Sequence, residues 1–302
     1  MEPFFPPLRK SYYFRAGQHT LHLGQTTRLM GILNLTPDSF SQDGCFKDGI
    51  HDPQRNLDQA LRLIEEGADI LDVGAESTRP GARPVSVKEE LHRLVPTLKL
   101  LSRKTKIPIS VDTYKPKVAQ KALELGASII NNIMGTTPDR TLLKMVRDHQ
   151  AGIILMHIRG KPQTMQRAPR YRNLMEEIIR ELQKSLEICL EIGIKSDRIV
   201  IDPGIGFGKT LQHNLEILRQ LGELRRLDRP VLLGTSRKSF IGKILNRDFK
   251  DRLCGTVATI VVGIFNGAHF VRVHDVACSR DAARMADAIL QLPNSNRAPH
   301  SL

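Results

Sequence analysis

Short apolar, β-branched segments alternate with amphipathic helical segments along almost the whole chain. This alternation is typical of repeated βαβ units, in which helices connect parallel strands. The segments with the length and composition of buried strands are 28–34, 69–74, 107–112, 128–132, 152–157, 198–202, 230–235 and 269–274. Eight such strands favour a sheet that closes on itself. The predicted fold class is therefore α/β, a single (β/α)8 TIM barrel with a short N-terminal extension.

Residues with known capping roles mark the expected ends of the helices. Asp52 and Pro53 predict the start of the first crossover helix, and Gly67 predicts its end. Ser86 and Glu89 have the spacing of a capping box at the start of the next helix.

The chain has 302 residues, a normal length for one barrel of this kind. We expect an N-terminal extension over 1–27, with a hairpin at the bottom of the barrel. The barrel itself is expected over 28–291, and a polar tail over 292–302.

Several classes of protein do not fit the composition. No apolar run reaches the length of a membrane span, and the first residues, MEPFFPPLRK, lack the apolar core of a signal peptide. We therefore expect a cytoplasmic protein without a membrane partner. The four cysteines lie far apart, which favours reduced thiols over a zinc or redox centre.

The net charge of +13 raises the question of nucleic-acid binding. The lysines and arginines are scattered, however, and no nucleic-acid-binding motif accompanies them. We predict no nucleic-acid partner, and a basic surface that attracts anionic substrates.

The predicted strands become polar at their last residues, where the active site of a barrel lies. A single polar residue there can equally cap the next helix, but most of the strands share the feature. The residues concerned are Asn34, Asp112, Asn131, His157, Asp202, Arg272 and His274.

Asp112 and Asp202 each follow an apolar strand, so each carboxylate is expected to be half buried and to need a partner. A metal, a proton transfer or a ligand with adjacent N–H groups would each serve. No cluster of metal ligands accompanies them. A 2-amino-4-oxo pyrimidine ring, with two neighbouring N–H groups, suits a carboxylate, and Asn131 can read another edge of it.

The loops after the last two strands carry the expected anion site. Arg272 and His274 lie two residues apart, on one side of a strand, which suits an oxyanion. A buried structural histidine is the alternative for His274. Lys238 follows the seventh strand, where it is either solvated, paired with Asp202 or a donor to a ring carbonyl.

The glycine-rich stretch DPGIGFGKT, residues 202–210, is not a nucleotide-binding loop by its spacing. Pro203 occupies the place of the first glycine of a P-loop, and Lys209 that of the third glycine of the dinucleotide fingerprint. This loop therefore needs another explanation.

Eight motifs, in order along the chain, resemble those of the dihydropteroate synthase family. They are MGILNLTPDSFS, DVGAESTRPGA, ISVDT, GASIINN, MHIRGKPQTMQ, IDPGIGFGKT, GTSRKSFIG and FVRVHDV, and they extend from about Met30 to Asp275. The resemblance implies a (β/α)8 barrel, Mg²⁺ as the metal, a homodimer and membership of a family that is the target of sulfonamides. It implies that 6-hydroxymethyl-7,8-dihydropterin diphosphate and p-aminobenzoate condense to 7,8-dihydropteroate and pyrophosphate.

The resemblance also implies roles for individual residues. The implied pterin pocket consists of Asp112, Asn131, Met156, Asp202, Lys238 and Arg272. The implied diphosphate site consists of Asn34, Arg272 and His274, with Asn34 as the protein ligand of Mg²⁺. The implied p-aminobenzoate site consists of Thr78, Arg79, Phe207 and Ser239, with Phe40 and Pro80 on loops that close over it. The residues expected to act in catalysis are Asp112, Asp202, Lys238, Arg272 and His274.

Two departures from the family pattern keep alternatives open. Asn132 stands where many members have aspartate, and the first loop reads SQDGC where SDGG is common. The alternatives are a catalytically impaired pterin-binding paralogue and a pterin-dependent methyltransferase.

Overall fold

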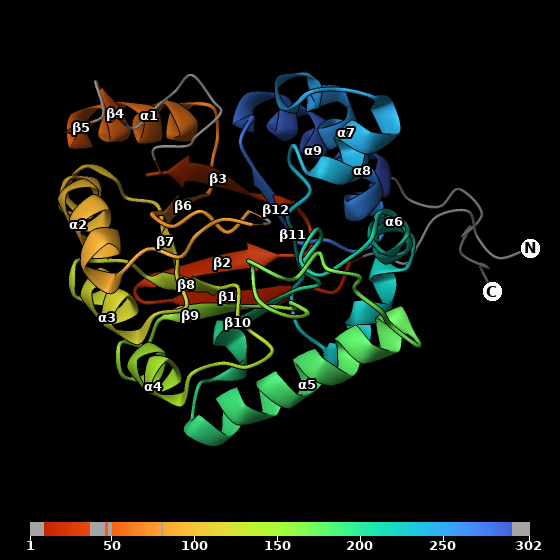
Figure 1. The fold of residues 1–302 in the computed structure, drawn as a ribbon, viewed down its shortest axis with the longest axis horizontal. Helices are drawn as coiled ribbons and strands as arrows, with labels where there is room; N and C mark the ends of the chain where they lie inside the picture. The colour runs from red at the N-terminus through yellow and green to blue at the C-terminus, as the bar shows by residue number, and fades with distance from the viewer. Residues whose placement is uncertain (1–8, 37–45, 48–49, 80, 292–302) are drawn as a thin grey trace, which may run out of the picture.

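The computed structural model describes residues 9–36, 46–47, 50–79 and 81–291 (Figure 1). Phe40, Pro80 and the predicted tail over 292–302 lie outside these residues. Between β3 and α1, the described residues include two short paired strands, β4 (Phe46–Lys47) and β5 (Ile50–His51).

Eight parallel strands form the centre of the molecule, as predicted. They are β3 (Arg28–Asn34), β6 (Ile70–Gly74), β7 (Ile109–Asp112), β8 (Ile129–Asn132), β9 (Gly152–Met156), β10 (Ile199–Asp202), β11 (Leu232–Leu233) and β12 (Phe270–Val273). Their order in the sheet is β10-β9-β8-β7-β6-β3-β12-β11. A parallel bridge between Ile201 and Val231 joins the two ends of this order, so the sheet closes into the predicted barrel.

Helices surround the strands on the outside (Figure 1). They are α1 (Pro53–Glu65), α2 (Val87–Lys104), α3 (Pro116–Glu124), α4 (Arg140–Asp148), α5 (Leu174–Ile192), α6 (Leu211–Arg219), α7 (Ser239–Leu245), α8 (Leu253–Phe265) and α9 (Val276–Gln291). Three 3₁₀ helices, η1 (Ser196–Arg198), η2 (Leu221–Leu227) and η3 (Phe249–Asp251), lie in the connections. None of the helices in the described residues has the length and apolar character needed to cross a membrane.

The caps follow the sequence signals, with one difference. Asp52 accepts hydrogen bonds from the first N–H groups of α1, and Ser86 Oγ accepts from Glu89 N–H at the start of α2. The Glu89 carboxylate, however, accepts from Arg93 Nε at 2.8 Å instead of completing the capping box. An i,i+4 ion pair with the partly buried Arg93 has replaced the second half of the predicted box.

The strand period of two divides the core into two layers. Outward side chains of the strands pack against the helices in one large cluster, which includes Leu71, Val111 and Val271. Inward side chains at the strand starts form a second apolar cluster that fills the bottom of the barrel, with Met30, Ile70, Ile129, Ile154, Val200, Leu232 and Phe270. The polar strand ends therefore lie above a dry, apolar floor.

An antiparallel hairpin closes this floor from below. It consists of β1 (Tyr12–Ala16) and β2 (His19–Leu23). Phe14 is buried in the floor and contacts Phe270 edge to face, with ring centroids 5.8 Å apart. A Cβ on Gly152 would lie 2.5 Å from Phe14 Cζ, so glycine at the start of β9 makes room for the ring. The boundaries at residues 27 and 291 remain predictions, and the hairpin shares its core with the barrel.

Truncation of Phe14 is expected to destabilise the whole barrel. Phe14→Ala should lower the free energy of unfolding by about 3–5 kcal/mol, because it leaves a cavity between the hairpin and the floor. Tyr13 is the matched control, since it lies next in sequence on the opposite face and is 59% exposed. Chemical denaturation should show less than about 1 kcal/mol for Tyr13→Ala. Equal losses for the two variants would contradict the role of the hairpin as a plug.

Candidate active site at the carboxyl ends of the strands

A cavity of about 490 Å³ opens at the carboxyl ends of the strands, opposite the hairpin. All the residues that the sequence assigned to a site line this cavity. They are Asn34, Thr78, Arg79, Asp112, Asn131, Met156, Asp202, Phe207, Lys238, Ser239, Arg272 and His274. These positions lie on six of the strands and on the segments that follow β6, β10, β11 and β12, and the closure of the barrel brings them together.

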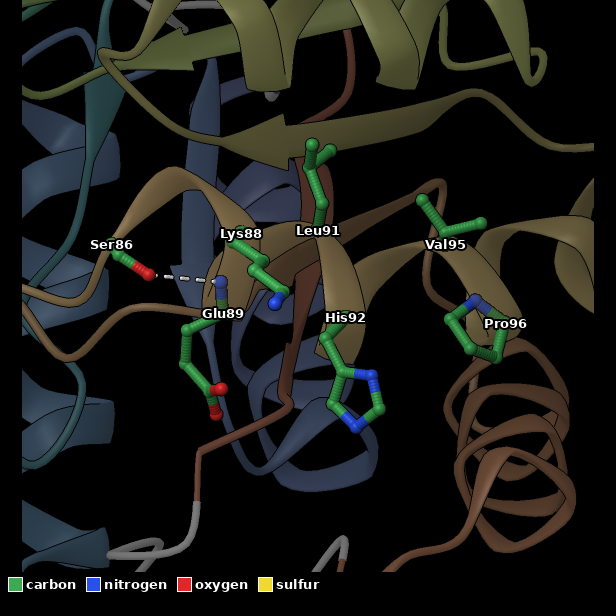
Figure 2. A pocket seen from close by; sticks show the side chains of 7 residues that line it. All are labelled: Ser86, Lys88, Glu89, Leu91, His92, Val95 and Pro96. Carbon is green, nitrogen blue, oxygen red and sulfur yellow. Dashed lines mark hydrogen bonds between the residues drawn. The ribbon is translucent and has the colours of Figure 1, made fainter.

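A larger hollow, of about 720 Å³, lies against the outer side of α2. Figure 2 shows that its lining side chains all come from one stretch, Ser86 to Pro96. Its polar groups are used locally, since Ser86 caps the helix and Glu89 pairs with Arg93. Because no polar groups from separate elements converge there, the cavity at the strand ends is the better candidate.

In one row of the mouth, a glycine lies between two polar residues. Asn34, Gly74 and Asp112 lie side by side in register on β3, β6 and β7. A Cβ on Gly74 would lie 3.7 Å from Asn34 Oδ1 and 3.9 Å from Asp112 Oδ2. The missing side chain leaves open space between an amide oxygen and a carboxylate oxygen, both of which are hard ligands.

Below this row, a buried aspartate that sequence reasoning missed forms the centre of a charged group. Asp72 lies in the middle of β6 and has no exposed surface. Its Oδ2 accepts from Arg272 Nε at 2.6 Å and from Asn131 Nδ2 at 3.1 Å. Arg272 also donates to Asp112 Oδ2 at 3.1 Å. In this structure the Arg272 guanidinium therefore lies between two carboxylates.

Both carboxylates predicted to read a ligand have raised pKa values. Burial raises the pKa of Asp112; the Arg272 charge opposes this shift and the Asp72 charge adds to it. Burial also raises the pKa of Asp202 to about 6, although Gly204 N–H donates to its Oδ1 at 2.7 Å. Asp112 Oδ1 has no hydrogen-bond partner among the described residues. A ligand that supplies N–H donors would therefore stabilise the ionised form of each carboxylate.

Lys238 packs against the loop that follows β10. Its Nζ is 4.2 Å from the centre of the Phe207 ring, a cation–π contact. Burial and the charge of Arg272 together lower the pKa of Lys238 to about 8, against the opposing effect of Asp202. An aromatic ring and an ammonium group thus form one wall of the cavity.

The glycines of DPGIGFGKT allow close backbone packing, which explains that motif. Gly204 and Gly208 have positive φ values of 69° and 65°. A Cβ on either would collide with a backbone carbonyl of the segment after β9, His157 O or Arg159 O. Lys209 does not reach toward a phosphate. Its buried Nζ donates to Phe207 O at 3.0 Å and contacts His157 Nδ1 at 3.0 Å.

His157 does not line the cavity, although the sequence placed it with the polar strand ends. It follows Met156, whose side chain points inward, so the strand period turns His157 outward. It is fully buried, with Nε2 3.1 Å from Glu181 Oε2 on α5. Burial, together with the charge of Lys209, lowers its pKa to about 4, so the ring is neutral.

His274 does line the cavity and is also neutral. Burial, with the charge of Arg272, lowers its pKa to about 3. Ser236 Oγ accepts from His274 N–H at 3.2 Å and lies 3.0 Å from Nδ1. A hydroxyl that donates to Nδ1 leaves the ring proton on Nε2, so His274 can offer one neutral donor.

The outer rim is rich in arginine around one aromatic ring that sequence reasoning also missed. The guanidinium carbons of Arg79, Arg237 and Arg252 lie 5.5, 5.3 and 6.0 Å from the centre of the Phe249 ring. Arg237 is fixed by two hydrogen bonds to Asp275. Phe249 lies in the short helix η3, and no sequence pattern marks it.

Asn132, the departure from the family pattern, has a local structural role. Its Oδ1 accepts from Met134 N–H at 2.9 Å, directly after β8. This hydrogen bond needs only a side-chain oxygen, which asparagine and aspartate both provide. The side chain is buried beside the loop and does not line the cavity.

The described residues contain no group of three or more His, Cys, Asp or Glu side chains that could hold a metal ion. Any metal at this mouth would therefore take most of its ligands from bound anions and water.

Comparisons with known proteins show the family of this chain. Residues 30–274 match the family described as pterin binding enzyme. The dihydropteroate synthase of Clostridium beijerinckii is 44% identical over 92% of this chain and 99% of its own. That of Escherichia coli K12 is 41% identical over 89% of this chain and 94% of its own.

Solved structures give the same result. The Yersinia pestis dihydropteroate synthase, in a complex with a sulfonamide drug, superposes with a TM-score of 0.86 and 39% identity, over 92% of this chain and 98% of its own. The Xanthomonas albilineans enzyme, with 4-aminobenzoic acid, has a TM-score of 0.84 and 38% identity, over 94% of this chain and 100% of its own. From its motifs, its barrel and these relatives, the chain belongs to the dihydropteroate synthase family of pterin-binding enzymes.

Proposed function

We propose that this chain joins 6-hydroxymethyl-7,8-dihydropterin diphosphate to p-aminobenzoate by the residue roles described below. The observation that carries the proposal is the convergence, in one cavity, of two buried carboxylates on one side and an arginine-rich rim on the other. The first suits the N–H edge of a pterin, and the second suits anionic groups. A corrinoid-dependent methyl transfer would leave the arginine-rich rim without a role.

The pterin ring is proposed to lie deep in the cavity, against Met156. Asp112 and Asp202 accept from its N–H groups, and Lys238 donates to its carbonyl oxygen. These hydrogen bonds satisfy carboxylates that burial otherwise penalises. The pterin therefore binds best when both carboxylates are ionised.

The row across β3, β6 and β7 fits a Mg²⁺ ion held with the diphosphate. Asn34 would supply the protein ligand, beside the space that Gly74 leaves open. One amide oxygen, with diphosphate oxygens and water, suits this ion. Mg²⁺, when bound, would neutralise part of the diphosphate charge and so favour its departure.

Residues of the chain would then stabilise both the leaving diphosphate and the pterin methylene from which it departs. His274 donates through Nε2 to the leaving diphosphate, and Arg272 adds positive charge next to it. As the C–O bond breaks, positive charge develops on the exocyclic methylene of the pterin. The ionised Asp112 and Asp202 are fixed nearby, and they stabilise that charge.

The second substrate is proposed to bind at the rim. Phe207 packs on the ring of p-aminobenzoate, and Ser239, at the start of α7, meets its carboxylate with Thr78 and Arg79. After the C–O bond breaks and pyrophosphate departs, the amine nitrogen forms a bond to the methylene carbon and loses one proton to water. The amine is neutral at pH 7, so no protein nucleophile or strong base is required.

Exposed apolar side chains on the last helices are consistent with the homodimer that the resemblance implies. They are Ile244, Leu245, Val262, Met285 and Ile289, which are 41–63% exposed. The homodimer and the cytoplasmic location remain predictions.

The first test is pyrophosphate release by the purified protein. We expect release in the presence of the dihydropterin diphosphate and Mg²⁺ only when p-aminobenzoate is added, with 7,8-dihydropteroate as product. Chelation of Mg²⁺ should stop it. Pterin binding without turnover would instead identify an impaired paralogue, and absence of pterin binding would contradict the pocket itself.

Removal of the Asp202 carboxylate should abolish pterin binding. For both Asp202→Ala and Asp202→Asn, calorimetry should show an affinity weakened by about a hundredfold, since the charged acceptor is lost. The asparagine keeps an acceptor for Gly204 N–H, so it separates loss of charge from disorder of the loop. Asp139→Ala is the control, because Asp139 only caps α4 at the surface. Near-normal affinity in the Asp202 variants would contradict the assignment.

Pterin affinity should fall as the solution becomes more acidic. The binding form of Asp202 is the carboxylate, which is lost as the pH falls through its pKa of about 6, and the raised pKa of Asp112 acts in the same direction. Binding of a pterin without phosphate, measured from pH 8 to pH 5, should weaken by about tenfold or more. A flat profile in the wild type would contradict this role, and Asp202→Asn should keep only the part of the pH dependence that Asp112 contributes.

A further inference from the structure

We propose that Asp72 is a positioning residue for the reaction, which fixes Arg272 and Asn131 together under the substrate. This inference rests on the proposed function. It assigns a role to a residue that begins one of the motifs, DVGAESTRPGA, but that the expected pocket did not include.

The place of Asp72 in the sheet is unusual for a carboxylate. Its neighbours along β6 are Ile70, Leu71 and Val73, and its partners in register are Ile32 and Ser110. A charge at such a depth is costly unless it is paired. Apolar replacement of buried ion pairs is often neutral or stabilising in proteins, so stability alone is a weak reason for an aspartate here.

Its contacts suggest a different reason. In the sheet order, β6 lies midway between β8 and β12, with β7 on one side and β3 on the other. A single oxygen, Asp72 Oδ2, accepts from Asn131 on β8 and from Arg272 on β12. The two donors are both proposed to contact the pterin. One buried atom thus sets the position of two side chains that come from opposite sides of the barrel mouth.

The bond to Arg272 also limits what the guanidinium can do. Asp72 occupies Nε, and Asp112 accepts from one terminal nitrogen. Without Asp72, the guanidinium would be free to turn fully onto Asp112 and compete with the pterin for that carboxylate. Asp72 therefore holds Arg272 in place, and Asp112 Oδ1 keeps an open side for the ligand.

The test compares Asp72→Ala, which removes the acceptor, with Asp72→Asn, which keeps an oxygen but removes the charge. We expect Asp72→Ala to raise the KM for the dihydropterin diphosphate by about tenfold or more, with the KM for p-aminobenzoate changed less than about twofold. Asp72→Asn should recover part of this loss. A general structural effect would move both KM values.

A second arm asks whether Asp72 acts through Arg272. In an Arg272→Lys background, which lacks the Nε contact, Asp72→Ala can act only through Asn131, so it should raise the KM for the pterin substrate by about threefold or less. The same tenfold effect in both backgrounds would overturn the proposal.

Asp287→Asn is the matched control. Asp287, on α9, is also buried, and its Oδ1 pairs with the guanidinium of Arg9 at 2.5 Å. It should lower stability without changing either KM. If Asp72→Ala does not fold, Asp72→Asn takes its place in both arms. If neither folds while Asp287→Asn does, Asp72 serves the barrel itself and the proposal fails.

The proposed function and this inference fail in different ways. Absence of turnover in the wild type would contradict the first. The second would then be judged by calorimetric pterin affinity in the same variants, where an unchanged affinity in Asp72→Ala would overturn it.

Discussion

Closure of the sheet is the constraint on which the rest of the molecule depends. The bridge between Ile201 and Val231 completes a ring of strands, and a ring has only one interior. Every second side chain of each strand must therefore enter the same space. At the strand starts this space is apolar and is sealed by Phe14 of the hairpin. The water-free floor lets a few charges at the other end act strongly on one another and on a ligand.

The electrostatics of the mouth follow from this arrangement. Asp202 is buried and Asp112, Lys238 and Arg272 are partly buried beside it, and each of the four shifts the pKa of others in the group. Burial disfavours the charged form of each group, so it raises the pKa values of the carboxylates and lowers that of the lysine. The site is thus prepared for a substrate that brings N–H donors to one side and negative charge to the other. The neutral His274 adds a donor that does not repel Arg272.

Much of this site could be predicted because it follows from strand ends. Asn34, Asp112, Asn131, Asp202 and Arg272 each close an apolar run, and the closed barrel brings such residues together.

Residues that break this rule could not be predicted. Asp72 lies inside its strand and not at the strand end, so the pattern that marks the other site residues does not mark it. His157 was misplaced because it is one residue past Met156, and the period of two turns it away. Phe249 lies in a connection whose path depends on tertiary packing alone.

The position of β12 has a consequence for how the protein is made. This strand, near the end of the chain, lies between β3 and β11, and it carries the Phe270 that meets Phe14. During synthesis, the hairpin and the first seven strands of the barrel emerge before their last neighbour exists. Until β12 leaves the ribosome, the nascent chain exposes apolar surface and two open sheet edges. The emergence of β12 is therefore the step that hides both.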